Sequence, residues 1–170
     1  MNDFEIKSAY EKQCIDSGIP YVALRAAFKS EGLDLRGLVN SKTEEDFRGI
    51  DALATVTNKT FEVFAFRTDY KFRAKGEDGR IYDDVLINLL SKNGKYGWAL
   101  DPDKKTDVVS YINVPARKVC LLYKEDMLDA KNQLKSHWSR RREKDNQINV
   151  ILEYEECKKL LPNFVGPIDF

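Results

Sequence analysis

The sequence predicts an α/β protein in which one domain holds a central mixed β-sheet flanked by helices. Its 170 residues, 42% of them hydrophobic and 33% charged, suit one domain with one sizeable core. Helical periodicity is found at both ends of the chain, and β-branched and aromatic residues are concentrated in the middle. We therefore divide the domain, residues 1–170, into N-terminal helices over 1–43, a core sheet over 47–123 and C-terminal helices over 124–170.

The first segment predicts a helix from about Asp3 to Ser17, with apolar side chains on a rough stripe. Gly18 and Pro20 close this helix, and residues 21–28 predict a second, short one. Residues 32–43 have no clear period and are predicted to form a loop.

A β-hairpin is predicted next, from two apolar runs over residues 50–56 and 60–68 that Thr57-Asn58-Lys59 separates. Side chains alternate between the two faces of a strand. One face of the second run therefore carries Phe61, Val63, Ala65 and Arg67, and the other carries Glu62, Phe64 and Phe66. Arg67 ends an otherwise apolar face, and Asp51 opens the preceding strand.

Basic residues interleave with aromatic ones over residues 69–80, which we predict to be a loop ending in a turn. This composition is typical of a loop that touches a phosphate backbone and stacks on a base. The alternative is a charged hairpin without a ligand. The predicted nucleic-acid contacts are Lys71, Arg73, Lys75 and Arg80.

Three further strands of the core sheet are predicted near residues 85, 110 and 120, and residues 124–139 predict a helix with one apolar face. The helix macrodipole favours the basic run that comes after it, residues 140–144. A second contact for nucleic acid or an acidic partner is predicted there, through Arg140, Arg141 and Arg142. Residues 149–154 form either a last strand or the start of a helix that Pro162 ends, and the tail over 163–170 packs back on the body.

The composition also bounds function and location. Lys plus Arg and Asp plus Glu both total 28, so only a local patch could attract nucleic acid. Three widely spaced cysteines and one histidine, His137, exclude the ordinary zinc frameworks and indicate a reducing compartment. The first residues do not read as a secretory signal, and no apolar run is long enough to cross a bilayer. We therefore expect a protein of the cytoplasm, or of a host's cytoplasm, that has no membrane contact.

Gly49-Ile50-Asp51-Ala52 resembles a segment of the PD-(D/E)XK nuclease-like superfamily, of the phage and bacterial type. The resemblance implies a restriction-endonuclease-like core. It also implies a divalent-metal site, which an Asp at the start of one strand and an acidic-X-Lys triplet on the next would form. Asp51 matches the metal-binding Asp, and the triplet is placed on Ala65-Phe66-Arg67, which lacks both the acid and the lysine.

A second resemblance lies in Gly97-Trp98-Ala99-Leu100-Asp101, followed by Lys105-Thr106-Asp107. Some phage and bacterial members of the superfamily carry similar segments before a strand. In those relatives the strand that matches residues 83–90 carries another acidic residue. Asn88 occupies the matching position here, so a second acidic position is expected to be lost.

These patterns lead to two expectations. The first is a catalytically impaired PD-(D/E)XK-like protein that binds nucleic acid or a partner protein, for example as a phage-type factor acting on host defence. The alternative is an active Mg²⁺-dependent DNA or RNA nuclease with a migrated acidic ligand. Its metal would be held by Asp51 with Glu62 or Glu45, and Arg67 would hold the scissile phosphate.

Overall fold

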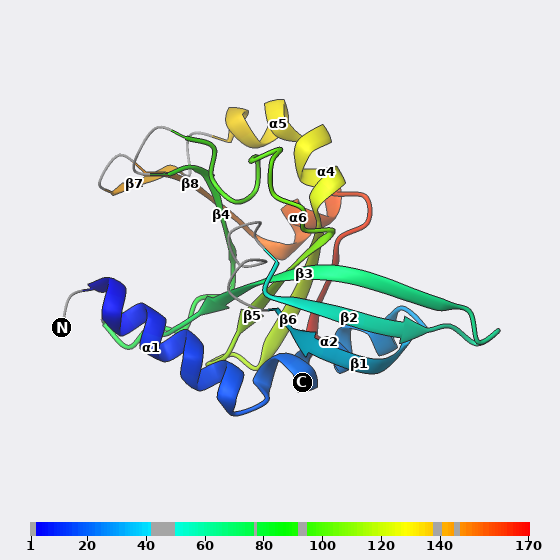
Figure 1. Ribbon diagram of the computed structural model, residues 1–170. Coiled ribbons are helices and arrows are strands. Elements are labelled where there is room, and N and C mark those ends of the chain that lie inside the picture. Colours follow the sequence, from blue (N-terminus) through cyan, green and yellow to red (C-terminus); the bar gives the residue numbers. More distant parts are fainter. Residues whose placement is uncertain (1–2, 42–49, 77, 92–94, 138–140, 145–146) are drawn as a thin grey trace.

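The computed structural model describes residues 3–41, 50–76, 78–91, 95–137, 141–144 and 147–170, without the side chains of 3–7 and 141–144. It is an α/β domain in which helices and a small second sheet flank a mixed central sheet (Figure 1). Among the described helices, none is both long enough and apolar enough to cross a membrane. The predicted fold class is therefore confirmed at this level.

The central sheet has six strands in the order β1-β2-β3-β5-β6-β9. Strands β3 and β5 run parallel, and every other neighbouring pair is antiparallel. The strand bounds are β1 Asp34–Asn40, β2 Ala52–Thr57, β3 Val63–Arg73, β5 Val108–Asn113, β6 Lys118–Tyr123 and β9 Val165–Asp169. The predicted hairpin is thus present as β2 and β3.

Two helices, α1 (Asp3–Asp16) and α2 (Ile19–Ser30), precede the sheet, and α2 packs against one of its faces. The buried side of α2 carries Ala23, Leu24, Ala27 and Phe28. The ring of Phe28 stacks on that of Phe66 in β3, with centroids 5.6 Å apart. Apolar residues at helical spacing in α2 therefore meet apolar residues at strand spacing in the sheet.

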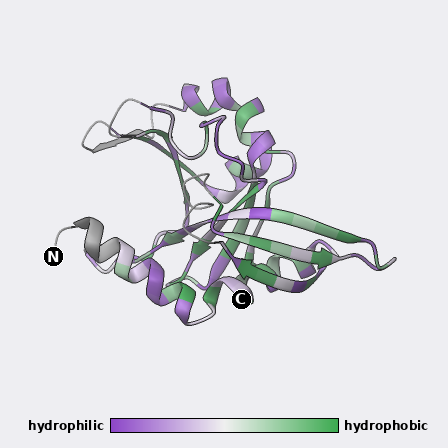
Figure 2. Ribbon diagram, viewed as in Figure 1, coloured by the Kyte–Doolittle hydropathy of each residue, from purple (hydrophilic) through white to green (hydrophobic). Residues whose placement is uncertain are grey.

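The opposite face of the sheet carries a second core. It packs against a three-stranded sheet, in the order β4-β8-β7, and three short helices (Figures 1 and 2). Alternation along β5 separates the cores, because Val108 and Ile112 belong to the first and Val109 and Tyr111 to the second. The bounds are β4 Val85–Leu90, β7 Arg141–Lys144, β8 Gln147–Leu152, α4 Lys124–Asp129, α5 Lys131–Ser136 and α6 Tyr154–Leu160.

The division of the chain into helical ends and a sheet-forming middle is wrong in several places. Residues 34–40 form β1 and not a loop, because they pair with β2 and bury Leu35. A register shift between Leu35 and Gly37 interrupts the alternation that would have revealed this strand. The C-terminal part contains β7, β8 and β9, so only some of it is helical.

Long-range pairing also overrides local preference elsewhere. The basic run over residues 141–144 consists of helix-forming residues, yet it forms β7 because it pairs with the apolar strand β8. The strand near residue 85, β4, belongs to the second sheet and not to the central one. The predicted helix over 124–139 divides into α4 and α5 at Ala130. Residues 69–73, predicted as loop, extend β3 because they pair with β5.

A first prediction concerns the core between α2 and the sheet. Replacing the fully buried Phe28 (Phe28→Ala) leaves a cavity against Phe66, so the free energy of unfolding in urea should fall by about 3–5 kcal/mol. The matched control is Tyr21→Ala, at a residue of the same helix that is 41% exposed. This variant should change the free energy of unfolding by less than about 0.5 kcal/mol. Equal stabilities for the two variants would contradict this packing.

Candidate functional site

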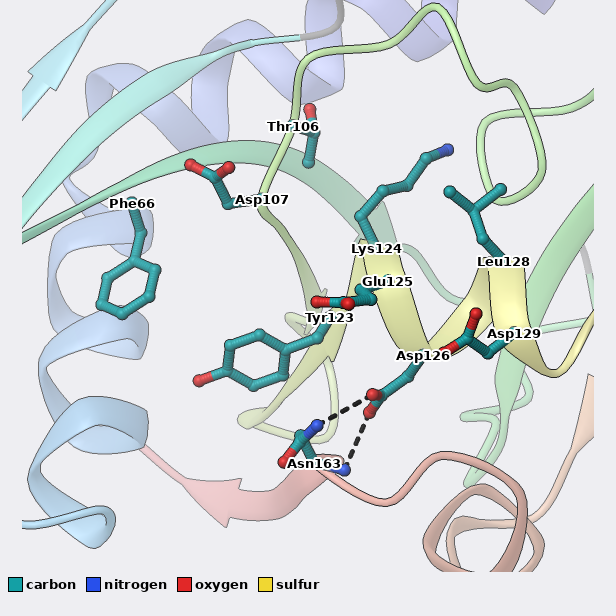
Figure 3. Close-up of a pocket in the computed structure, with 10 residues that line it drawn as sticks. All are labelled: Phe66, Thr106, Asp107, Tyr123, Lys124, Glu125, Asp126, Leu128, Asp129 and Asn163. Atoms are coloured by element: carbon teal, nitrogen blue, oxygen red, sulfur yellow. Dashed lines mark hydrogen bonds between the residues drawn. The ribbon is translucent and has the colours of Figure 1, made fainter.

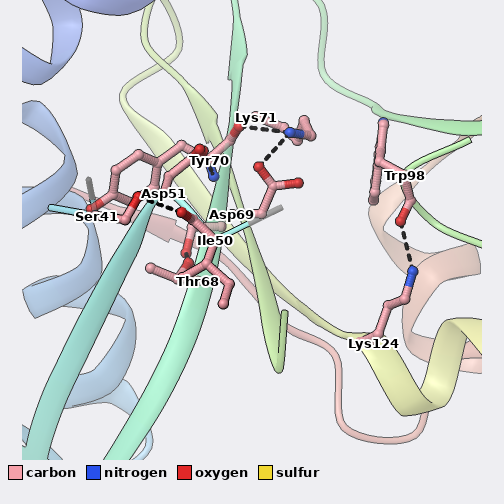
Figure 4. Close-up of polar contacts among 10 residues, drawn as sticks. Ser41, Ile50, Asp51, Thr68, Asp69, Tyr70, Lys71, Trp98 and Lys124 are labelled. Atoms are coloured by element: carbon pink, nitrogen blue, oxygen red, sulfur yellow. Dashed lines mark hydrogen bonds and ion pairs between the residues drawn. The ribbon is translucent and has the colours of Figure 1, made fainter. Parts of the chain in front are cut away.

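Two carboxylates face each other across the hairpin. Asp51 precedes β2, and Ala52 pairs with Thr68, so Asp51 lies opposite Asp69. The backbone N–H of Asp51 donates to the Thr68 carbonyl at 2.8 Å, and the N–H of Tyr70 donates to Asp51 Oδ2 at 2.6 Å (Figure 4). These bonds hold the Asp51 side chain beside β3.

Asp51 sits in surroundings that disfavour its charge. Asp69 is 3% exposed, and its Oδ2 is buried without a hydrogen bond in the described part of the chain. Burial, and then the neighbouring charge of Asp69, raise the pKa of Asp51 to about 7. Two adjacent carboxylates in a partly desolvated place are the arrangement that a bound cation stabilises.

Lys71 completes the group. Its Nζ donates to Asp69 Oδ1 at 2.5 Å and to the Tyr70 carbonyl at 3.1 Å (Figure 4). Asp69, Lys71 and their β5 partners Val109 and Tyr111 lie on the face of the sheet that meets the second core. Asp69-Tyr70-Lys71 thus presents a carboxylate, a backbone carbonyl and an ammonium group beside Asp51.

The acidic-X-Lys triplet of the resemblance therefore has a better match than Ala65-Phe66-Arg67. Residue 69 and not residue 65 lies across from Asp51, because the hairpin register pairs positions whose numbers sum to 120. Apolar alternation stops at Thr68, so the sequence predicts that the strand ends there and that a loop begins at Asp69. Counting the pairs outward from a turn centred on residue 60 would have identified Asp69.

A second lysine lies at the margin of this group. Lys124, the first residue of α4, donates from Nζ to the Trp98 carbonyl at 2.7 Å (Figure 4). It also donates to the Ala99 carbonyl at 3.1 Å. Burial lowers the pKa of Lys124 to about 8, and the charges of Asp101 and Asp69 act against this shift. No sequence pattern indicates this contact. It anchors the segment carrying Trp98 to α4.

Arg67, expected to hold a phosphate, is committed to another residue. Its Nε donates to Asp107 Oδ2 at 2.9 Å, its Nη2 to Oδ1 at 2.5 Å, and its backbone N–H to Oδ2 at 2.8 Å. This two-pronged pairing ties β3 to the start of β5. Asp107, from the second segment of resemblance, therefore has a structural contact.

Glu62 does not approach Asp51. It lies in the turn of the hairpin, where its carboxylate accepts hydrogen bonds from Asn58 Nδ2 and Thr60 Oγ1. The six residues of β2 separate the two ends of the hairpin by about 20 Å. Glu45 lies outside the described residues. Asn88 binds the Leu90 carbonyl and Asn149 Oδ1 within the second sheet.

The predicted nucleic-acid contacts differ in their availability. Arg73 pairs with Asp84 at 3.2 Å and lies 4.1 Å over the ring of Tyr82, so packing occupies its guanidinium. Lys75 and Arg80 are exposed on either side of a turn beyond the end of β3. The basic run of residues 140–142 cannot be placed as a contact: Arg140 lies outside the described residues, as do the side chains of Arg141 and Arg142.

The donor set is compatible with Mg²⁺. Within the described ranges no three His, Cys, Asp or Glu residues gather as metal ligands. The candidate donors at this place are two carboxylates, Asp51 and Asp69, and the Tyr70 carbonyl beside them. All are oxygen atoms, and Mg²⁺ commonly binds one or two carboxylates while keeping waters. Comparisons of the chain with protein-family models, with curated proteins and with solved structures found no match. The chemistry of these groups therefore carries the functional inference.

A second prediction concerns the raised pKa of Asp51. Between about pH 4 and pH 7 the folded protein keeps a proton on Asp51 that the unfolded chain has released. The contribution of Asp51 to stability therefore falls as pH rises through this window. Asp51→Asn lacks this loss and can still accept the N–H of Tyr70. In EDTA, the free energy of unfolding of the variant should rise relative to that of the natural protein by at least about 1 kcal/mol from pH 4 to pH 8. A difference between the two proteins that does not change with pH would contradict the prediction.

Proposed function

We propose that the protein is a Mg²⁺-dependent phosphodiesterase that cleaves nucleic acid, with a site of the PD-(D/E)XK type. The observation that supports it is the placing of Asp51 opposite Asp69, with the Lys71 ammonium 2.5 Å from Asp69. Structural ion pairs normally match one carboxylate with one cation. Here two carboxylates share one lysine, so a further positive charge would balance the group.

Each residue has a role in this proposal. Asp51 and Asp69 hold the metal through their carboxylates, with the Tyr70 carbonyl as a third oxygen donor. A bound Mg²⁺ would polarise the phosphoryl oxygen and lower the pKa of a bound water. Lys71, a compact charge on a flexible stem, would hold the attacking water or a phosphate oxygen next to the carboxylates.

The substrate class is argued from charge and position. A phosphodiester chain needs cations along its path, and the formal net charge of zero leaves this to local groups. Lys75 and Arg80 lie beyond the end of β3 that carries Lys71, and both are exposed. A nucleic-acid strand with its scissile phosphate at Asp51 could therefore reach both side chains.

The impaired protein preferred from the sequence becomes the second candidate. That preference depended on Ala65 and Arg67 as the triplet positions. Ala65 pairs with Thr55 and Arg67 with Leu53, so neither lies opposite Asp51. With Asp69 and Lys71 at these positions the residues needed for chemistry are present, and an active enzyme is the better proposal. A scaffold that binds nucleic acid or a host protein is the outcome if cleavage fails.

The third prediction tests this site. Calorimetry should detect Mg²⁺ or Mn²⁺ binding, and single- or double-stranded DNA or RNA should be cleaved in the same buffers. Asp69→Asn should abolish both. Lys71→Met should keep metal binding and lower the cleavage rate at least about 100-fold, because it leaves both carboxylates in place.

The control is Asp34→Asn, which neutralises an exposed carboxylate on β1 and should bind metal and cleave like the natural protein. Metal binding without cleavage would favour the scaffold. If the natural protein neither binds metal nor cleaves nucleic acid, the enzyme proposal is wrong. Cleavage that survives in Asp69→Asn would show that this pair is not the site.

A further inference from the structure

A pocket of about 400 Å³ lies where β6 ends and α4 begins. The ring of Tyr123, the last residue of β6, and the ring of Phe66, from β3, both line it (Figure 3). Their centroids are 6.5 Å apart, and their planes meet at 79°. Both rings pack against the first core yet stay half-buried. A cavity of this size with aromatic walls has the dimensions of a site for a small ligand or one side chain.

Helix α4 gives this pocket a negative charge. Its residues Glu125 and Asp129 line the pocket and are exposed, whereas Asp126, also in the lining, is only 7% exposed. None of the three forms an ion pair with a described residue. Asp126 accepts hydrogen bonds from the backbone N–H and the side-chain amide of Asn163, both at 2.8 Å (Figure 3). These neutral donors fix the buried carboxylate without balancing its charge.

No cation in the lining is left to balance these carboxylates. Among the described residues that line the pocket, only Lys124 is basic, and its ammonium donates to two backbone carbonyls instead. The fourth lining carboxylate, Asp107, is the one that Arg67 pairs with. Burial, and then the charges of two nearby carboxylates, raise the pKa of Tyr123. The aromatic walls therefore lie in a negative electrostatic potential.

The chemistry of the lining favours an organic cation over a metal ion. No three carboxylates in the described part of the chain gather closely enough to act together as metal ligands. Aromatic faces attract organic cations, and this attraction is strongest where the cation is partly desolvated. A guanidinium group is flat, weakly hydrated and able to stack on aromatic rings while it donates to carboxylates. An ammonium group holds its water more firmly, so a half-buried aromatic pocket suits it less well.

We propose that this pocket binds a guanidinium group, which stacks against the rings of Tyr123 and Phe66 and donates to the carboxylates of α4. An arginine side chain of another protein and a small guanidino compound present this same chemistry. The site shares no residue with the group formed by Asp51, Asp69 and Lys71, so it does not depend on the proposed nuclease activity.

Titration of the ¹⁵N-labelled full chain, followed by NMR in EDTA and without nucleic acid, tests the proposal. The probes are butylguanidine and a blocked glycine peptide with one central arginine. Both should cause saturable shifts at the backbone amides of Tyr123 and α4. The same peptide with citrulline keeps the shape of the side chain but lacks its charge, and should bind at least about 10-fold more weakly. A lysine peptide should also bind more weakly than the arginine peptide.

The two probes also distinguish the sources of the guanidinium group. Tighter binding of the arginine peptide assigns the site to a partner protein, and equal or tighter binding of butylguanidine assigns it to a small compound. Variants of Tyr123 test the aromatic wall. Tyr123→Leu should weaken binding of either probe at least about 5-fold, because the face of the ring is lost. Tyr123→Phe keeps the ring and should bind like the natural protein. Circular dichroism confirms that both variants fold.

A charge variant tests the carboxylates at exposed positions, where the fold is not at risk. The double variant Glu125→Gln, Asp129→Asn should weaken binding at least about 5-fold. Its matched control, Asp16→Asn with Glu155→Gln, removes the same charge from exposed residues outside the pocket and should bind normally. The proposal would be overturned by a natural protein that neither arginine probe shifts, by a citrulline or lysine peptide that binds as tightly as the arginine peptide, or by unchanged binding in the charge variant or in Tyr123→Leu.

Discussion

The structure depends on the change of partner along β3. The strand pairs with β2 from Val63 to Thr68 and with β5 from Thr68 to Arg73, so only Thr68 is paired on both sides. There its buried hydroxyl shares a 2.6 Å hydrogen bond with Ser110 of β5. The antiparallel hairpin and the parallel part of the sheet are joined at this point. Asp51, one residue before β2, lies opposite Asp69, one residue after Thr68. The two carboxylates therefore meet where the antiparallel and parallel parts of the sheet join.

Local periodicity was enough to predict the hairpin and α2, because each of them has one apolar face. Together these elements were enough to predict the fold class. Local periodicity could not predict β1 or β7. The pattern of β1 is interrupted by a bulge, and β7 consists of residues that favour helices until β8 offers them a partner. Both strands exist through contacts with residues distant in sequence, which composition does not record. The place of β4 in the second sheet is also a property of long-range pairing.

The candidate site shows the same division. Asp51 could be identified from its position at the start of a strand, whereas Asp69 and Lys71 were hidden by a strand end placed at Thr68. Arg67 and Glu62 have the expected residue types, but Asp107 and the hairpin turn already satisfy their side chains. Residue type therefore predicts what a side chain can bind, and register decides which partner it meets.

The two ends of β3 differ because only one of them is covered on both faces. From Asp69 onward the strand lies between the two cores, and burial makes the neighbouring Asp51 carboxylate costly to ionise without a cation. Toward Val63 the strand has α2 on one face and solvent on the other, so its apolar side chains stay exposed. A carboxylate that is costly to ionise on its own supports the cation site proposed at Asp51 and Asp69, whereas the exposed apolar side chains at the other end of the strand contribute little to the stability of the core.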